Sequence, residues 1–216
     1  LLDRAYLRRR AALIDRRRAK PASAGIPKGG TVYLTAADTS GMMVSMIQSN
    51  YMGFGSGVVV PGTGISLQNR GAGFNLRPGH PNCVAPGKRP FHTIIPGFVT
   101  REGQPFATLG LMGGTMQAQG HAQLMVRIAE YGQNLQSAID GPRFRVVQGM
   151  DINVEEAFGT ATIAELARRG HRIQEIGEQY MDYGCSQMIR SLRRGGRGDG
   201  YEAASDPRRD SLPVGY

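Results

Sequence analysis

The chain has 216 residues, of which 40% are hydrophobic and 20% charged, and its formal net charge is +9. This length and apolar content suffice for one folded domain, and no apolar run approaches the roughly 20 residues of a membrane span, so we expect no membrane association. The two cysteines, Cys83 and Cys185, have neither CxxC nor zinc-binding spacing, so the sequence predicts no disulfide framework, no metal site and no cofactor.

Much of the positive charge lies in residues 1–20, where eight Lys or Arg side chains accompany two Asp side chains. The same segment has apolar residues at roughly helical spacing, namely Ala5, Leu7, Ala11, Ala12 and Ile14. We therefore expect a helix with a solvated basic face. Because no surface motif of basic and aromatic residues supports it, we expect no nucleic-acid partner.

The sequence does not begin with Met, and we expect residue 1 to be internal to a longer protein, which leaves the localisation open between cytoplasm and periplasm. Residues 21–30, PASAGIPKGG, have the composition of an exposed linker that is accessible to cleavage. We interpret residues 31–216, downstream of this linker, as one structural unit.

The first half of that unit is predicted to be a series of hairpins. Residues 31–37 and 42–49 alternate like strands around DTSG, a turn sequence with Asp first and Gly last. A second strand, turn and strand is expected in residues 56–69, and a third pair, residues 92–100 and 105–112, flanks the turn REGQ. The glycine-rich stretch GFGSGV leads into VVV and not into a helix, so we interpret it as a bend and not as a phosphate loop.

Helical spacing dominates the second half. Residues 116–131 and 134–140 are expected to be helices that end at Gly132 and Gly141, and a third helix is expected from Thr160, as its N-cap, to Gly170. Short strands are expected around residues 171–176, 187–192 and 201–204. Hairpins followed by helices indicate an α+β fold in which helices cover antiparallel sheets. A parallel, doubly wound sheet is less favoured because the early strands lack crossover helices.

Two glycines form a candidate anion-binding turn. Gly113 and Gly114 end a predicted strand and enter a predicted helix, where unobstructed backbone N–H groups and the helix dipole suit an oxyanion. An ordinary tight strand-to-helix turn is the alternative.

The sequence does not assemble a Ser, His and Asp triad. The four histidines, His80, His92, His121 and His171, lack ligand spacing, and His121 lies inside a predicted helix, where we expect a structural role. An N-terminal threonine is another route to an activated nucleophile, because its own α-amine accepts the hydroxyl proton. Thr31 has that amine only if the bond between Gly30 and Thr31 is cut.

Several stretches carry a resemblance to a known family: TVYLTAADTSGMMVS, FGSGVVVPGTGISLQNRGAGF, PGKRPFHTIIP, LMGG, GPRF and ASDPR. In this order and spacing, the sequence resembles the gamma-glutamyltranspeptidase family of self-processing N-terminal-nucleophile hydrolases, especially its transpeptidase-like and oxamate amidohydrolase branch. The resemblance implies a four-layer αββα sandwich of antiparallel sheets. It also implies that residues 1–30 are the end of a large subunit with its processing linker and that residues 31–216 are the small catalytic subunit. The expected partner is the large subunit of the same precursor, in a heterodimer that pairs further.

By position, the resemblance implies that Thr31 cuts the precursor after Gly30 and then attacks the substrate amide. It implies that Ser49 helps to position and activate this nucleophile. Gly113 and Gly114 match the glycine pair whose backbone amides hold the oxyanion.

Other matched positions depart from the family pattern. Gly73 replaces an aspartate that binds the substrate's α-amino group, and His92 and Thr93 replace a serine pair that helps to bind its α-carboxylate. Tyr51 replaces an asparagine, and Arg70 stands where Glu or Gln is frequent. We expect these four residues, Tyr51, Arg70, His92 and Thr93, to line the substrate site. Arg70 either favours an anionic acyl amide or is a structural ion-pair partner.

The resulting functional hypothesis is an amidohydrolase or acyltransferase that forms an acyl-enzyme on Thr31, with a small amide or a gamma-glutamyl-like compound as substrate. Because Gly73 offers no anion for a substrate ammonium, glutathione is not the expected preference. Genuine gamma-glutamyl transfer or glutathione hydrolysis is one alternative. A non-catalytic or unprocessed relative with a role in assembly is the other.

Overall fold

The computed structural model describes residues 4–12, 31–176, 183–192 and 200–215. The expected basic helix is present as α1 (Arg4–Ala11), whereas Ile14 of its predicted stripe, the linker at residues 21–30 and Gly30 lie outside the described residues. In the described part of the chain, no helix combines the length and the apolar character needed to cross a membrane.

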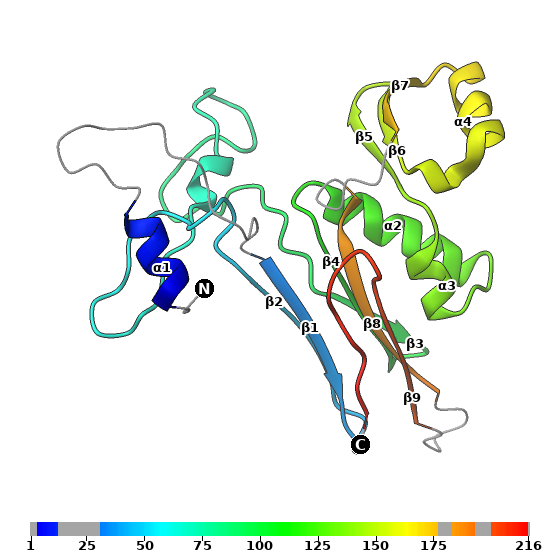
Figure 1. Ribbon diagram of the computed structural model, residues 1–216, viewed down its shortest axis with the longest axis horizontal. Helices are drawn as coiled ribbons and strands as arrows, with labels where there is room; N and C mark the ends of the chain where they lie inside the picture. The colour runs from blue at the N-terminus through cyan, green and yellow to red at the C-terminus, as the bar shows by residue number, and fades with distance from the viewer. Residues whose placement is uncertain (1–3, 13–30, 177–182, 193–199, 216) are drawn as a thin grey trace.

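A four-stranded antiparallel sheet organises the fold (Figure 1). Its strands lie in the order β3 (Gly97–Arg101), β4 (Gln104–Met112), β8 (Cys185–Ser191) and β9 (Tyr201–Ser205). β3 and β4 form the predicted hairpin, and its two turn residues, Glu102 and Gly103, have φ values of 52° and 76°. Positive φ at both turn positions is typical of the tightest hairpin turns.

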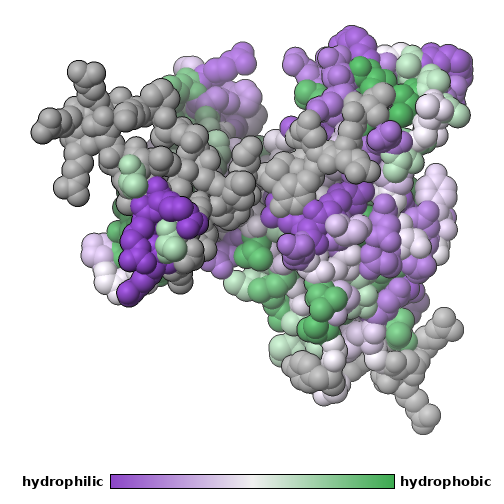
Figure 2. Space-filling model, in the orientation of Figure 1, coloured by the Kyte–Doolittle hydropathy of each residue, from purple (hydrophilic) through white to green (hydrophobic). Residues whose placement is uncertain are grey.

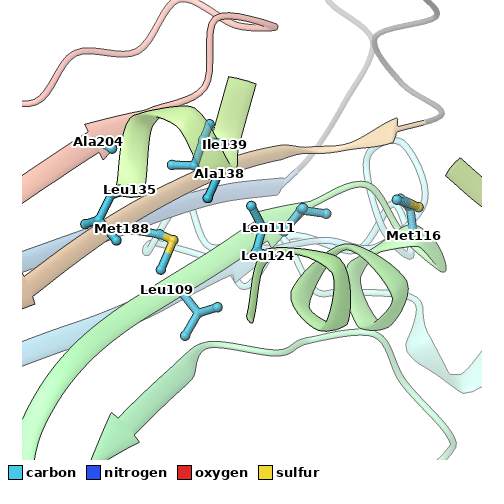
Figure 3. Packing of buried hydrophobic residues seen from close by; sticks show 9 residues of the cluster. All are labelled: Leu109, Leu111, Met116, Leu124, Leu135, Ala138, Ile139, Met188 and Ala204. Carbon is cyan, nitrogen blue, oxygen red and sulfur yellow. The ribbon is translucent and has the colours of Figure 1, made fainter. Parts of the chain in front are cut away.

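Two helices cover one face of this sheet. These are α2 (Met116–Ala129) and α3 (Leu135–Asp140), and α3 begins where the Asn134 side chain accepts a hydrogen bond from the backbone N–H of Ser137 at 2.8 Å. The main hydrophobic core lies between helices and sheet (Figure 3) and consists of Leu109, Leu111, Met116, Leu124, Leu135, Ala138, Ile139, Met188 and Ala204. Gly132, with φ of 63°, follows the end of α2 as predicted.

The hairpin of β1 (Thr31–Ala37) and β2 (Met43–Ser49) packs against the opposite face of the sheet. Its predicted DTSG turn is closed by a hydrogen bond from the Gly41 N–H to the Asp38 carbonyl at 3.0 Å. The described residues thus form three layers, namely helices, the four-stranded sheet and the β1–β2 hairpin. They contribute no second helical layer over that hairpin.

The outward face of the β1–β2 hairpin is apolar and open to solvent. Figure 2 shows hydrophobic side chains over these strands, and the exposed residues there are Val32, Leu34, Val44 and Met46, at 43–51% exposure. These side chains alternate with inward-facing ones, as expected for strands buried on one face.

A smaller unit lies beyond α3 and contains a parallel strand pair that was not predicted (Figure 1). β5 (Phe144–Gln148) pairs antiparallel with β6 (Asp151–Val154), but β6 pairs in parallel with β7 (Arg172–Ile176). A parallel pair needs a crossover connection, and here η2 (Glu156–Phe158) and α4 (Gly159–Arg168) provide it. β5 and β6 were not predicted, because both are short and Gly149 and Met150 interrupt their pattern.

Three local predictions were wrong. Thr160 lies in the first turn of α4, whose N-cap is Phe158, so Thr160 is not the cap. Residues 56–69 fold back on themselves but share only one isolated bridge, between Val59 and Ser66, because glycines and a Pro-Gly turn interrupt the pairing. Residues 92–96 precede β3 as irregular chain, since Pro96 removes a backbone donor.

A buried ion pair joins α3, β9 and the chain before β5. Arg143, which is 1% exposed, donates from Nη2 to Asp206 at 2.6 Å and to the Ile139 carbonyl at 3.1 Å. Asp206 also accepts from the backbone N–H of Ser186 at 2.9 Å. A second cation, Arg208, bridges Asp206 and Glu155 at 3.1 and 2.6 Å. Glu155 also accepts from the backbone N–H of Arg143 at 2.6 Å, so each carboxylate has a cation and a backbone N–H that offset its desolvation.

Replacing Asp206 with Ala should leave Arg143 buried and unpaired, and should lower the free energy of unfolding by about 3–5 kcal/mol. Denaturant-induced unfolding of the protein measures this change. Glu165→Ala is the matched control, because Glu165 pairs with Arg168 and Arg169 on the exposed surface of α4. Equal losses of stability in the two variants would contradict the importance of the buried pair.

Candidate active site

Thr31 and Ser49 lie opposite each other in the β1–β2 register. The Thr31 hydroxyl donates to the Ser49 hydroxyl at 2.8 Å. Ser49 Oγ also accepts from the backbone N–H of Tyr51 at 2.9 Å. The Ser49 side chain is therefore fixed by the backbone that follows its own strand, and it fixes the orientation of Thr31 in turn.

Contacts between β1 and β4 place Thr31 beside the C-terminal end of β4, which Gly113 and Gly114 follow. The Tyr33 ring lies where a side chain at Gly110 would be, and the hydroxyls of Thr35 and Thr108 are hydrogen-bonded. Tyr33 thus faces Gly110 and Thr35 faces Thr108, so residue numbers fall by two along β1 as they rise by two along β4. The same step brings Thr31 level with Met112, immediately before Gly113 and Gly114.

Gly113 and Gly114 form the turn between β4 and α2. Their φ values are 137° and 59°, in the region that favours glycine. A Cβ on Gly113 would lie 2.9 Å from the Cα of Gly184, so the two glycines must pack directly against each other. The predicted glycine turn is present, and it follows the end of β4 that lies level with Thr31.

Gly184 is held in place by the buried Arg143. Arg143 Nη1 donates to the carbonyl oxygens of Tyr183 and Gly184, at 3.1 Å each. One guanidinium thus links the ion pair with Asp206 to the segment that packs on Gly113. The sequence analysis did not predict roles for Gly184 and Arg143. The available signals were the position of Arg143 in GPRF and that of Gly184 directly before a strand.

Tyr51 and Arg70 lie together beside Ser49. Tyr51 has a φ of 75°, which is strained for a bulky side chain, and its ring lies 5.0 Å from Arg70 Cζ. This distance is that of a cation–π contact. Partial burial lowers the pKa of Arg70 from its usual value, but a guanidinium stays protonated at neutral pH. No described carboxylate pairs with Arg70, so the structure does not support the ion-pair alternative within the described residues.

The short helix that ends at Gly73 contacts the irregular segment that contains His92 and Thr93. Gly73 ends the short helix η1 (Arg70–Gly73), and a Cβ on it would lie 2.7 Å from the Phe91 carbonyl oxygen. Thr93 is buried and His92 is exposed. The structure thus brings the segment before His92 against η1, but among the described residues it records no hydrogen bond from His92 or Thr93 to Thr31.

Other nucleophiles and bases fit catalysis poorly. His121 hydrogen-bonds through Nδ1 to the Gln117 carbonyl at 2.6 Å within α2, and burial lowers its pKa, in agreement with the structural role that we expected. Burial raises the pKa of Cys185 to about 12, so its thiol stays protonated at neutral pH. Within the described residues, no group of three His, Cys, Asp or Glu side chains could hold a metal ion.

Comparison with known proteins identifies the relatives of this chain. The profile of the family described as Gamma-glutamyltranspeptidase matches residues 1–216. The oxamate amidohydrolase proenzyme of Klebsiella pneumoniae is 38% identical over 208 residues, which cover 94% of this chain but 39% of that protein. This chain therefore spans well under half the length of that relative.

Solved structures show the same fold. The cephalosporin acylase from Bacillus halodurans is 44% identical, with a TM-score of 0.76, and the match covers 98% of this chain and 39% of that chain. A gamma-glutamyltranspeptidase from Pseudomonas nitroreducens complexed with L-DON is 26% identical, with a TM-score of 0.70, and the match covers 85% of this chain and 98% of that one. These matches confirm the predicted N-terminal-nucleophile hydrolase fold. Because the family profile also extends along the whole sequence, the chain belongs to the gamma-glutamyltranspeptidase family.

Proposed function

We propose that the chain is the end of a large subunit, residues 1–30, followed by the small catalytic subunit, residues 31–216, of a self-processing amidohydrolase or acyltransferase. Thr31 lies opposite Ser49 in the β1–β2 register and donates its hydroxyl to that of Ser49 at 2.8 Å, which supports Thr31 as the nucleophile at this boundary. The match to the Pseudomonas nitroreducens chain adds support. It covers 98% of that chain but 85% of this one, and residues 31–216 make up a similar share of this sequence, as expected if that chain corresponds to the small subunit.

The hydrogen bond between Thr31 and Ser49 carries the proposal. The Thr31 hydroxyl attacks the carbonyl carbon of the amide, and the Thr31 α-amine, whose reference pKa is about 7.7, accepts the hydroxyl proton. The C–N bond then breaks, and the proton leaves with the nitrogen as ammonia or an amine. Water hydrolyses the resulting ester and restores the hydroxyl, whereas an acceptor amine would give acyl transfer. In maturation the same hydroxyl would attack the carbonyl carbon of Gly30, and the bond between Gly30 and Thr31 would break, which frees the Thr31 α-amine. Water would then hydrolyse the ester between Gly30 and the Thr31 hydroxyl and separate the two chains.

Gly113 and Gly114 are proposed to donate backbone N–H groups to the oxyanion of each tetrahedral intermediate. Their place beside the start of β1 and the absence of side chains support this role. Donors held rigidly before the reaction stabilise developing charge without reorganisation. The contact of Gly113 with Gly184 would provide this rigidity.

Tyr51, Arg70, His92 and Thr93 are proposed to line the acyl side of the site. A small amide is favoured as substrate over a gamma-glutamyl compound, since Gly73 has no room for the side chain of an ammonium-binding aspartate. The oxamate amidohydrolase and cephalosporin acylase among the relatives are consistent with amide substrates outside gamma-glutamyl chemistry. Gamma-glutamyl transfer is the second candidate, supported by the Pseudomonas nitroreducens enzyme.

The large subunit is proposed to cover the exposed apolar face of the β1–β2 hairpin. Val32, Leu34, Val44 and Met46 are each 43–51% exposed there, although they sit on the strands that carry Thr31 and Ser49. A second helical layer on this face would complete the expected four-layer sandwich. The heterodimer is thus part of the proposed enzyme, and further pairing of heterodimers stays a prediction.

Thr31→Ala should block both maturation and turnover, because it removes the hydroxyl that performs each attack. We expect no fragment that begins at residue 31, and a loss of amidase activity of about a thousandfold or more. Intact-mass measurement and an amidase assay on the full-length precursor test this. Thr35→Ala, the same change on the same strand, should still mature. A Thr31→Ala protein that still splits and hydrolyses amides would refute the assignment.

Ser49→Ala should lower kcat by about tenfold, because it removes the acceptor that orients the Thr31 hydroxyl. Ser49→Thr keeps a hydroxyl at this position and should retain most of the activity. Steady-state kinetics on matured protein distinguish the two variants. Equal activity in Ser49→Ala and the unmodified enzyme would show that Ser49 has no role in positioning.

A direct comparison of substrates separates the two enzymatic candidates. We expect a higher kcat/KM for short acyl amides than for a gamma-glutamyl anilide, because the site offers no carboxylate at position 73 for the substrate ammonium. A preference for the gamma-glutamyl anilide would favour gamma-glutamyl transfer. A protein that stays as one chain and turns over neither substrate would favour an assembly role.

A further inference from the structure

The residues proposed to line the acyl side of the site lie on a long stretch of irregular chain. Residues 50–96, between β2 and β3, are all described, and η1 is their only named helix or strand. Tyr51 lies before η1, Arg70 begins it, and His92 lies on a third segment after it. Because no continuous strand ladder fixes this chain, other hydrogen bonds must hold its three segments together.

The Asn69 side chain connects the segment before η1 to the start of η1. Its Oδ1 accepts from the backbone N–H of Met52 at 3.0 Å, and its Nδ2 donates to the Met52 carbonyl at 3.2 Å. Asn69 occupies the N-cap position of η1, where asparagine commonly caps a helix, but its side chain makes no capping bond. Its amide serves the contact across the chain instead, and this contact fixes the backbone next to both Tyr51 and Arg70.

The Asn82 side chain makes a similar connection at the other end of η1. Its Nδ2 donates to the Gly73 carbonyl at 2.6 Å, and its Oδ1 accepts from the backbone N–H of Phe91 at 2.8 Å. The backbone of Asn82 is held as well, because its N–H donates to His80 Nδ1 at 3.0 Å and its carbonyl accepts from the Asn75 N–H at 3.1 Å. The end of η1 is therefore joined to the third segment.

Two glycines let the same segments approach each other main chain to main chain. A Cβ on Gly55 would lie 2.3 Å from the carbonyl oxygen of Leu67. A Cβ on Gly73 would lie 2.7 Å from the carbonyl oxygen of Phe91. Because neither glycine places a side chain between the segments, the two asparagine amides can reach across and add directional bonds that fix the relative position of the segments.

Building on the proposed function, we propose that Asn69 and Asn82 are positioning residues of the acyl site. They hold the three segments as one wall, so that the groups on this wall keep the spacing that a substrate acyl group requires. A site that is ordered before binding avoids the entropic cost of ordering it with the substrate. Thr31 is held instead by Ser49, across the β1–β2 hairpin. Loss of either asparagine amide should therefore weaken substrate binding and selectivity but leave maturation at Thr31 in place.

The test measures KM, kcat and substrate selectivity of the matured protein with its large subunit. Asn69→Ala and Asn82→Ala each remove one amide. Asn69→Gln and Asn82→Gln keep both hydrogen-bonding groups on a longer side chain, and they decide the test where an alanine variant does not fold. Thr63→Ala is the matched control. The Thr63 hydroxyl also makes one donor and one acceptor bond to the main chain, at 2.9 and 3.1 Å, but within its own turn of the same irregular stretch.

We expect Asn69→Ala and Asn82→Ala to raise KM for a short acyl amide by about tenfold, while kcat changes by less than about threefold. The ratio of kcat/KM between that amide and a gamma-glutamyl anilide should move towards one, because a loosened wall discriminates less. The glutamine variants should fall between the alanine variants and the unmodified protein. Thr63→Ala should keep both values, and every variant should form the chain that begins at Thr31.

Unchanged KM and selectivity in both asparagine sites, or equal changes in Thr63→Ala, would overturn the inference. A loss of kcat without a change of KM would also overturn it, because the asparagines would then act on the nucleophile and not on the acyl site. These results leave the proposed function intact if the unmodified protein forms a chain that begins at Thr31 and hydrolyses amides. Absence of that chain would instead remove the proposed function, and the inference with it.

Discussion

The contact between Tyr33 and Gly110 determines where Thr31, the proposed nucleophile, lies. Because Gly110 has no side chain, the Tyr33 ring lies directly on β4, and the neighbouring hydroxyls of Thr35 and Thr108 meet in the same register. This register brings the first residue of β1 beside the last residues of β4. The candidate oxyanion glycines, Gly113 and Gly114, follow at once. A larger residue at position 110 would separate the sheets and displace Thr31 from them.

The candidate site has two parts, one on regular strands and one on irregular chain, and we call the first the rigid half. Thr31, Ser49 and Gly113 lie on strands or directly at their ends, and the buried Arg143 ties Gly184, the neighbour of Gly113, to the core. Tyr51 and Arg70 instead lie on chain with little regular structure. A rigid scaffold suits a reaction that needs fixed donors, and loops are where specificity varies among relatives. We therefore propose that the rigid half carries the chemistry of the family, whereas Tyr51 and Arg70 set the properties of the acyl site.

Much of this arrangement could be predicted from the sequence, because its signals are local. The alternation in residues 31–37, the DTSG turn and the spacing of α2 each depend on neighbouring residues, and all were predicted. The parallel pairing of β6 with β7 was missed, since it depends on a crossover that only tertiary packing reveals. Gly110 was missed as well, although a glycine inside a strand signals a close approach. The link from Arg143 to Gly184 spans distant parts of the chain, and no local pattern encodes it.

Trapping of the acyl-enzyme tests the central claim most directly. The matured protein is quenched during turnover of a short amide, digested, and its peptides are weighed. We predict that the acyl mass is attached to the peptide whose N-terminus is Thr31. An acyl group on any other residue, or a mature protein without a chain that begins at Thr31, would contradict this account.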